Sequence, residues 1–116
     1  MEQTNFSLSV LLCVEEGTYV AQCLEYDIAA QGRSLHEAMQ RFQATFVAHI
    51  TLDLQEGRSP LCDVQRAPDR YWEQFEKAEP LARPMPLRMP MDLPADVAAS
   101  VPKPWMIRAT AQAAVI

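Results

Sequence analysis

One amphipathic helix constrains the fold of this 116-residue chain more than any other feature. Ser34 and Glu37 have the spacing of a capping box, in which the Ser hydroxyl accepts a hydrogen bond from a first-turn N–H and the Glu carboxylate reaches back to the N–H of the cap. Gly57 is a natural C-terminal stop, and Pro60 follows it. We therefore expect a helix over residues 35–55. Its apolar side recurs at helical spacing, at Leu35, Ala38, Met39, Phe42, Phe46, His49, Ile50 and Leu54.

The residues before this helix have the pattern of a β-hairpin. Residues 5–15 alternate, and Gly17 supplies the positive φ that a tight turn requires. Residues 19–24 then form the return strand. The first strand is expected to bury one face, formed by Phe6, Leu8, Val10, Leu12 and Val14.

A bend at residues 25–27 precedes a third short strand over residues 28–31, and Gly32 lets the chain turn from that strand into the helix. The pattern predicts an α+β fold, with a small antiparallel sheet packed against one long helix.

The second half of the chain has weaker signals. Residues 68–78 form a short helix candidate with Pro68 in its first turn, and prolines punctuate the chain from Pro80 to Pro104. Residues 105–116 alternate as a strand does, but their alanines also suit a helix. The short helix carries Tyr71, Trp72 and Phe75 on one face. This aromatic face either packs on the domain or forms an oligomer interface.

Length and composition indicate one domain. We divide it into a β-β-β-α core over residues 1–58 and an extension over residues 59–116 that packs on the same domain. The extension consists of the short aromatic helix, a Pro-rich arm from Pro84 to Pro94 and the last strand. The arm is interpreted either as a flexible tail or as a segment that wraps a neighbouring subunit.

Charge and residue content exclude several classes of protein. The net charge of −5 weighs against direct contact with phosphate backbones and suits a basic protein partner. No apolar run approaches the length of a membrane span, and the first residues do not have the pattern of a signal peptide. Three cysteines without a signal peptide predict reduced thiols in a cytoplasmic protein without a membrane association.

The sequence predicts no enzyme, no cofactor and no metal site. Glu25, Asp27 and Glu37 are the candidate carboxylates for a two-metal nuclease, but Glu37 already caps the helix. The cysteines and histidines lack the close ligand spacing of structural zinc sites. His36 is expected in solvent, whereas His49 lies on the apolar stripe and is expected in the core.

The ordered set of hairpin, bend, glycine and capped helix resembles the N-terminal domain of the bacterial HicB-type antitoxins and their solitary relatives. The match covers about residues 6–55, and its positions are Gly17, Tyr19, Val20, Ala21, Gly32, Ser34, Leu35, Glu37 and Ala38. The resemblance implies a β-β-β-α-β unit of partial RNase H-like fold that forms homo-oligomers. In operon-encoded members it implies binding to a small basic HicA-type toxin that cleaves mRNA. The antitoxin blocks the toxin sterically and has no catalysis of its own.

The chain departs from the family pattern at two places. The family bend often reads Pro-Gly where this chain has Tyr26 and Asp27, so Glu25, Tyr26 and Asp27 are the candidate partner interface. Residues 89–97 resemble only the opening of a ribbon-helix-helix unit, and Pro102 and Pro104 stop any helix there. The sequence therefore weighs against a DNA-binding domain.

Three hypotheses of function follow from these features. The leading one is a HicB-like protein that acts by protein–protein binding. The second is a stand-alone structural or small-ligand-binding homo-oligomer without a toxin. The third is an RNase H-like nuclease.

Overall fold

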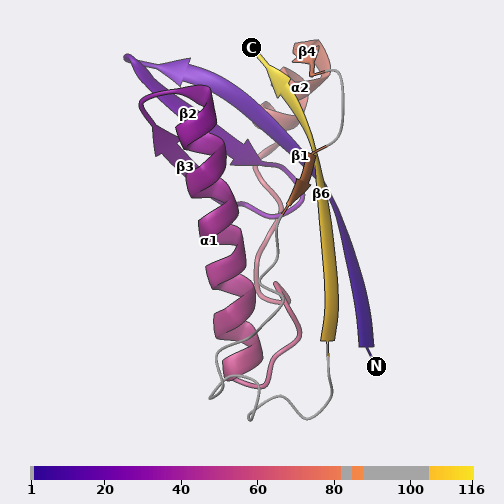
Figure 1. Ribbon diagram of the computed structural model, residues 1–116. Helices are drawn as coiled ribbons and strands as arrows, with labels where there is room; N and C mark the ends of the chain where they lie inside the picture. The colour runs from indigo at the N-terminus through magenta and orange to yellow at the C-terminus, as the bar shows by residue number, and fades with distance from the viewer. Residues whose placement is uncertain (1, 82–84, 88–104) are drawn as a thin grey trace.

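The chain folds into an α+β domain with one mixed sheet (Figure 1). The computed structural model describes residues 2–81, 85–87 and 105–116, with side chains for residues 5–81 and 109–116. The sheet has the order β3-β2-β1-β6-β4, and β5 also pairs with β6. The elements in chain order are β1 (Glu2–Glu15), β2 (Thr18–Cys23), β3 (Ala29–Gly32), α1 (Leu35–Gln55), α2 (Asp69–Lys77), β4 (Glu79–Pro80), β5 (Met85–Leu87) and β6 (Trp105–Val115).

The predicted hairpin is confirmed. β1 and β2 pair antiparallel up to Glu15 and Thr18, and the two turn residues between them, Glu16 and Gly17, have φ of 51° and 79°. Positive φ at both turn residues gives a backbone twist that matches the twist of the flanking strands. β3 then pairs antiparallel with β2, so the first three strands form a meander as expected.

The prediction of a purely antiparallel sheet is wrong for β6. This strand runs parallel to β1 from the pair Glu2–Trp105 to the pair Leu12–Val115. Parallel neighbours need a long crossover connection, and here the chain passes through α1 and α2 before it returns to β1. Residues 105–115 are therefore a strand, and the helical alternative that the alanines left open is wrong.

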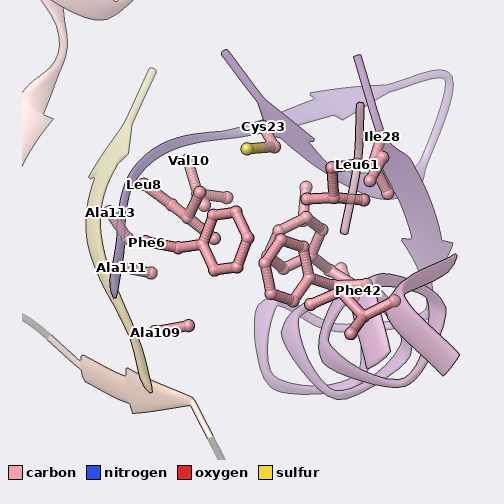
Figure 2. Close-up of a cluster of buried hydrophobic side chains, with 14 of the residues drawn as sticks. Phe6, Leu8, Val10, Cys23, Ile28, Phe42, Leu61, Ala109, Ala111 and Ala113 are labelled. Carbon is pink, nitrogen blue, oxygen red and sulfur yellow. The ribbon is translucent and has the colours of Figure 1, made fainter. Parts of the chain in front are cut away.

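The core lies between the sheet and α1 (Figure 2). Alternate residues of β1 and β6 point towards α1, where Phe42 and Phe46 are fully buried. The rings of Phe6 and Phe46 meet edge to face with their centroids 5.5 Å apart. Two predictions about this core are wrong. Val14 is 53% exposed because it lies beyond the part of β1 that α1 covers, and His49 is exposed to solvent at the margin of the helical stripe.

Helix α1 has the predicted bounds of residues 35–55. The Ser34 hydroxyl accepts the N–H of Glu37 at 3.0 Å. The Glu37 carboxylate accepts the N–H of Arg33 at 3.3 Å, one residue before the cap that we expected it to reach. The first bond satisfies an N–H group that a helix start leaves free, and the second ties Glu37 to the residue before the cap.

Gly32 joins β3 to α1 by a close backbone approach. A Cβ at this position would lie 2.5 Å from the Ala38 nitrogen and 2.9 Å from the Glu37 carbonyl carbon. Real Cβ atoms do not approach backbone so closely, so only glycine fits without a shift of the helix. The requirement at Gly32 is therefore one of space between strand and helix.

The C-terminal end of α1 is closed by Asp53 and Gly57. Gly57 has φ of 72°, and the Arg58 N–H donates to the Asp53 carbonyl at 2.8 Å, as in a Schellman motif. The Asp53 carboxylate is buried and accepts hydrogen bonds from the Arg58 guanidinium at 2.9 Å and from the Leu61 N–H at 2.7 Å. These bonds hold Leu61, which is buried in the core with φ of 61°.

The chain then crosses to the other face of the sheet, where α2 lies against β1 (Figure 1). The Ala67 N–H donates to the Leu24 carbonyl at 2.9 Å just before α2 begins. Leu11, Leu24 and Ala114 are buried on this second face. The short helix predicted over residues 68–78 is confirmed as α2. Most of the Pro-rich arm and the segment 89–97 lie outside the described residues.

Within the described part of the chain, neither helix combines the length and the apolar character that a membrane span requires.

Candidate functional site

Glu25 ends the ladder between β1 and β2. The Leu24 N–H donates to the Ser9 carbonyl at 2.9 Å, but the Leu24 carbonyl accepts from Ala67. The Glu25 carboxylate takes its place and accepts the Ser9 N–H at 2.6 Å. Glu25 is half-buried, so its first role is to close the strand pairing.

Tyr26 and Asp27 complete the bend and differ in exposure. The Tyr26 ring meets Phe6 edge to face, with centroids 5.6 Å apart, and burial raises the pKa of the Tyr26 hydroxyl. Asp27 is exposed, and its carboxylate accepts the Gln22 side-chain amide at 2.8 Å. Of the three residues predicted to contact a partner, only Asp27 is exposed. The partner role of the bend stays a prediction.

The aromatic residues of α2 form a half-exposed surface. Tyr71, Trp72 and Phe75 are all partly exposed, and no residue of α2 is buried. The Trp72 indole N–H donates to the Ala67 carbonyl at 3.2 Å. We call these three residues the α2 aromatic patch. Their placement is compatible with a contact surface, and the predicted oligomer interface stays a prediction.

Two arginines lie on the aromatic rings of this patch. The Arg66 guanidinium carbon lies 4.5 Å from the Trp72 ring centroid, and that of Arg70 lies 4.7 Å from the centroid of Tyr71. Such cation–π contacts contribute about 0.5–1 kcal/mol at exposed sites. Two of the positive charges of the domain therefore lie beside aromatic rings.

An open hollow with acidic walls lies at the tip of the β1–β2 hairpin. Its lining residues are Glu15, Glu16, Thr18, Val20 and Gln31. Neither carboxylate forms an ion pair within the described residues. In contrast, Arg33 and Arg41 pair with Glu37, and Arg58 pairs with three acidic residues. Among the described side chains, the negative charge at the hairpin tip therefore has no paired cation.

The three carboxylates considered for a two-metal nuclease already have partners within the fold. Glu37 is paired with Arg41 at 3.0 Å, and Glu25 accepts from the backbone. Among residues 2–81, 85–87 and 105–116 no group of three or more His, Cys, Asp or Glu side chains could hold a metal ion. Burial raises the pKa of the Cys23 thiol to about 11, so that thiol stays protonated and unreactive near neutral pH.

Sequence reasoning missed three features of these surfaces. The bond from Ser9 to Glu25 joins residues that are not close in sequence, and no local pattern signals it. The buried Asp53 had a weak signal, since it lies beside Ile50 and Leu54 on the buried side of α1. The hollow combines a turn with Gln31 of β3, and only the strand register places them together.

Comparison of the chain with models of known protein families, with curated proteins and with solved structures found no match.

Proposed function

We propose that this chain is a HicB-like antitoxin-type protein of the cytoplasm that acts by binding another protein. Its partner is a small basic HicA-type toxin that cleaves mRNA. The protein blocks this toxin sterically and catalyses no reaction itself. The observation that carries the proposal is the order of elements: three antiparallel strands, a capped helix, and a later strand parallel to the first. This order agrees with the partial RNase H-like unit that the resemblance implies.

The residues that carry the resemblance act mainly in folding. Gly17 forms the hairpin turn, Tyr19 pairs with Gly32 across β2 and β3, and Ser34 caps α1. Such roles preserve the scaffold and leave its surface free to vary. The contacts that select a partner must therefore come from exposed residues.

Uncompensated acidic side chains are the exposed groups best suited to a basic partner. Glu15 and Glu16 at the hairpin tip are exposed, and so is Asp27 at the opposite end of β2. Several carboxylates on one surface attract a positively charged partner and raise its association rate. Salt screens this effect. We infer that these carboxylates guide the toxin towards the sheet.

The test is co-expression with the product of a small basic reading frame beside this gene. The expected result is recovery of growth and a complex that survives size-exclusion chromatography. Changing Glu15 and Glu16 to Gln is expected to slow association roughly tenfold at low salt. The matched control changes Glu73 and Glu76 of α2 to Gln, which removes equal charge elsewhere. If the unaltered protein gives no growth recovery and forms no complex, the antitoxin proposal is refuted.

We further propose that the protein is a homo-oligomer in solution. The α2 aromatic patch is half-exposed, and aromatic side chains are enriched in protein interfaces. Light scattering on the purified protein would measure its mass. A mass of one chain, 13.1 kDa, at every concentration would contradict the oligomer proposal while leaving toxin binding to be judged by co-expression.

A further inference from the structure

Strand β1 extends well beyond the strand that pairs with it on one side. β1 covers residues 2–15, but β2 pairs only with Val10–Glu15. The last bonds on this side are those of Ser9, whose carbonyl accepts from Leu24 and whose N–H donates to the Glu25 carboxylate. Among the described residues, no strand pairs with the part of β1 before Ser9 on the side where β2 would otherwise continue.

The backbone at this edge presents consecutive donors and acceptors. Alternate residues of a strand direct their N–H and C=O groups to opposite edges. Gln3, Asn5 and Ser7 thus direct theirs to the same side as Ser9, away from β6. Within the described residues, no group bonds to the backbone of these three on that side. We call residues 3–7 the open edge of β1.

The edge of the sheet at β3 is protected. β3 is only four residues long, and the Arg41 guanidinium donates to the Gln31 carbonyl at 3.2 Å on its outer side. Short strands and charged side chains are the usual means by which proteins prevent edge-to-edge pairing. Residues 3–8, with the sequence QTNFSL, contain no charge, no Pro and no Gly. The open edge of β1 is thus suited to receive another strand.

We propose that β1 of a second copy of this chain pairs antiparallel with the open edge about a two-fold axis at Asn5. Gln3 then lies opposite Ser7 of the second copy, and Asn5 lies opposite Asn5. These three pairs exchange about six main-chain hydrogen bonds. The interface is isologous, since the same strand serves on both sides.

Charge favours a second copy over a basic partner at this position. The net charge of −5 makes two copies repel each other, and a two-fold axis brings equivalent residues close together. Only an uncharged segment can meet itself without like charges in contact, and residues 3–8 are such a segment. Asn5 and Ser7 are exposed and polar, so that their side chains can form hydrogen bonds across the pair. A basic partner would instead gain from acidic residues, which this edge lacks.

This inference deepens the homo-oligomer part of the proposed function, and it is independent of a toxin. The β1–β1 pairing leaves the hairpin tip free, because Glu15 and Glu16 lie at the opposite end of β1. It also replaces the α2 aromatic patch as the main contact between the copies.

The first experiment measures the mass of the unaltered protein and of edge variants by light scattering. We expect twice 13.1 kDa for the unaltered protein. Asn5→Lys, which sets two ammonium groups side by side, and Ser7→Pro, which removes an outward N–H, are expected to give one chain. Thr110→Lys, an exposed position on the neighbouring β6, and Ser7→Ala are the matched controls and are expected to keep two chains. Circular dichroism checks that each variant is folded.

The second experiment tests the register. Residues that face each other in a hydrogen-bonded antiparallel pair have Cα atoms about 5.5 Å apart, a distance that a disulfide spans. Asn5→Cys in a Cys62→Ser background should form a disulfide between copies on mild oxidation, whereas Thr110→Cys should not. A mass of one chain at every concentration would overturn the inference. A dimer that persists in both edge variants but dissociates on Phe75→Glu would also overturn the inference. That result would leave the proposed protein-binding function intact.

Discussion

The two helices of this protein are both amphipathic, yet they contribute differently to the fold. α1 begins at a side-chain cap and buries six residues. It packs so closely on Gly32 that a Cβ there would lie 2.5 Å from the Ala38 nitrogen. α2 begins at Asp69, its cap position Pro68 forms no side-chain cap bond, and none of its residues is buried. The apolar and polar sides of α2 are nevertheless well separated.

The contrast shows that amphipathic spacing identifies the inner side of a helix but does not determine how deeply that side is buried. α1 lies over the core-facing side chains of the strands, and the segment around Leu61 completes that core. α2 lies against the second face of the sheet with its aromatic rings half-exposed. α1 is therefore expected to determine stability, and α2 to offer contact surface.

The largest expected effect is that of Phe46→Ala in α1. Removing a fully buried ring should lower the free energy of unfolding by about 3–5 kcal/mol, because a cavity remains between Phe6 and Phe42. The matched change in α2, Phe75→Ala, should cost about 1 kcal/mol or less. Urea denaturation of both variants measures the two values. Equal losses would show that α2 supports the fold as strongly as α1 does.

A pH dependence comes next, from Cys23 in the core. Its pKa is raised to about 11 by burial, against an ordinary value near 9 in the unfolded chain. The Cys23 thiolate forms at lower pH in the unfolded chain than in the folded protein. The folded state therefore keeps its full stability below pH 9 and loses part of it as the pH rises from 9 to 11. The loss should be roughly 2–3 kcal/mol. Cys23→Ala should remove this part of the pH dependence, and Cys62→Ala, at an exposed site, should leave it unchanged.

Gly32→Ala tests the close approach of β3 and α1. The added methyl group would overlap the Ala38 nitrogen, and the shift needed to relieve it should cost about 1–3 kcal/mol. Gly57→Ala is the control, because nothing lies within 4 Å of its Cβ position and only its φ of 72° opposes the change. That control should cost about 1–2 kcal/mol. Thermal unfolding ranks the two, and a smaller loss at Gly32 would mean that the helix can move away.

The smallest expected effect is that of the helix cap. Ser34→Ala removes the hydroxyl that accepts the Glu37 N–H and should cost about 1 kcal/mol. Ser59→Ala, at an exposed position beyond α1, should change stability by less than about 0.5 kcal/mol. Chemical denaturation at low salt resolves the difference. No loss at Ser34 would indicate that packing alone determines where α1 begins.

The sequence predicts the features that depend on neighbouring residues. The bounds of α1 and the hairpin turn agree with the structure because a cap, a stop and a glycine turn act over a few residues. The parallel pairing of β1 with β6 could not be predicted in this way. Alternation shows which face of a strand is buried, but it carries no information about the direction of a neighbour.

The candidate surfaces follow the same division. The position of the bend at residues 25–27 was predicted, but the bond that fixes Glu25 and the ring contact that covers Tyr26 come from β1. His49 was misplaced because a residue at the margin of a helical stripe can lie on either side of the boundary with solvent. Contacts between segments decide these cases, and a single sequence does not record them.

The pairing of β1 with β6 also determines the order in which the chain can fold. Residues that pair across this ladder lie about 100 positions apart, so closing that loop costs chain entropy that the local hairpin does not pay. β2, β3 and α1 can assemble from neighbouring segments, whereas the first half of β1 must wait for β6. Proteins with such distant contacts fold slowly for their size. During synthesis, Phe6 and Leu8 therefore stay without their β6 neighbours, Ala109 and Ala111, until those two residues have been made.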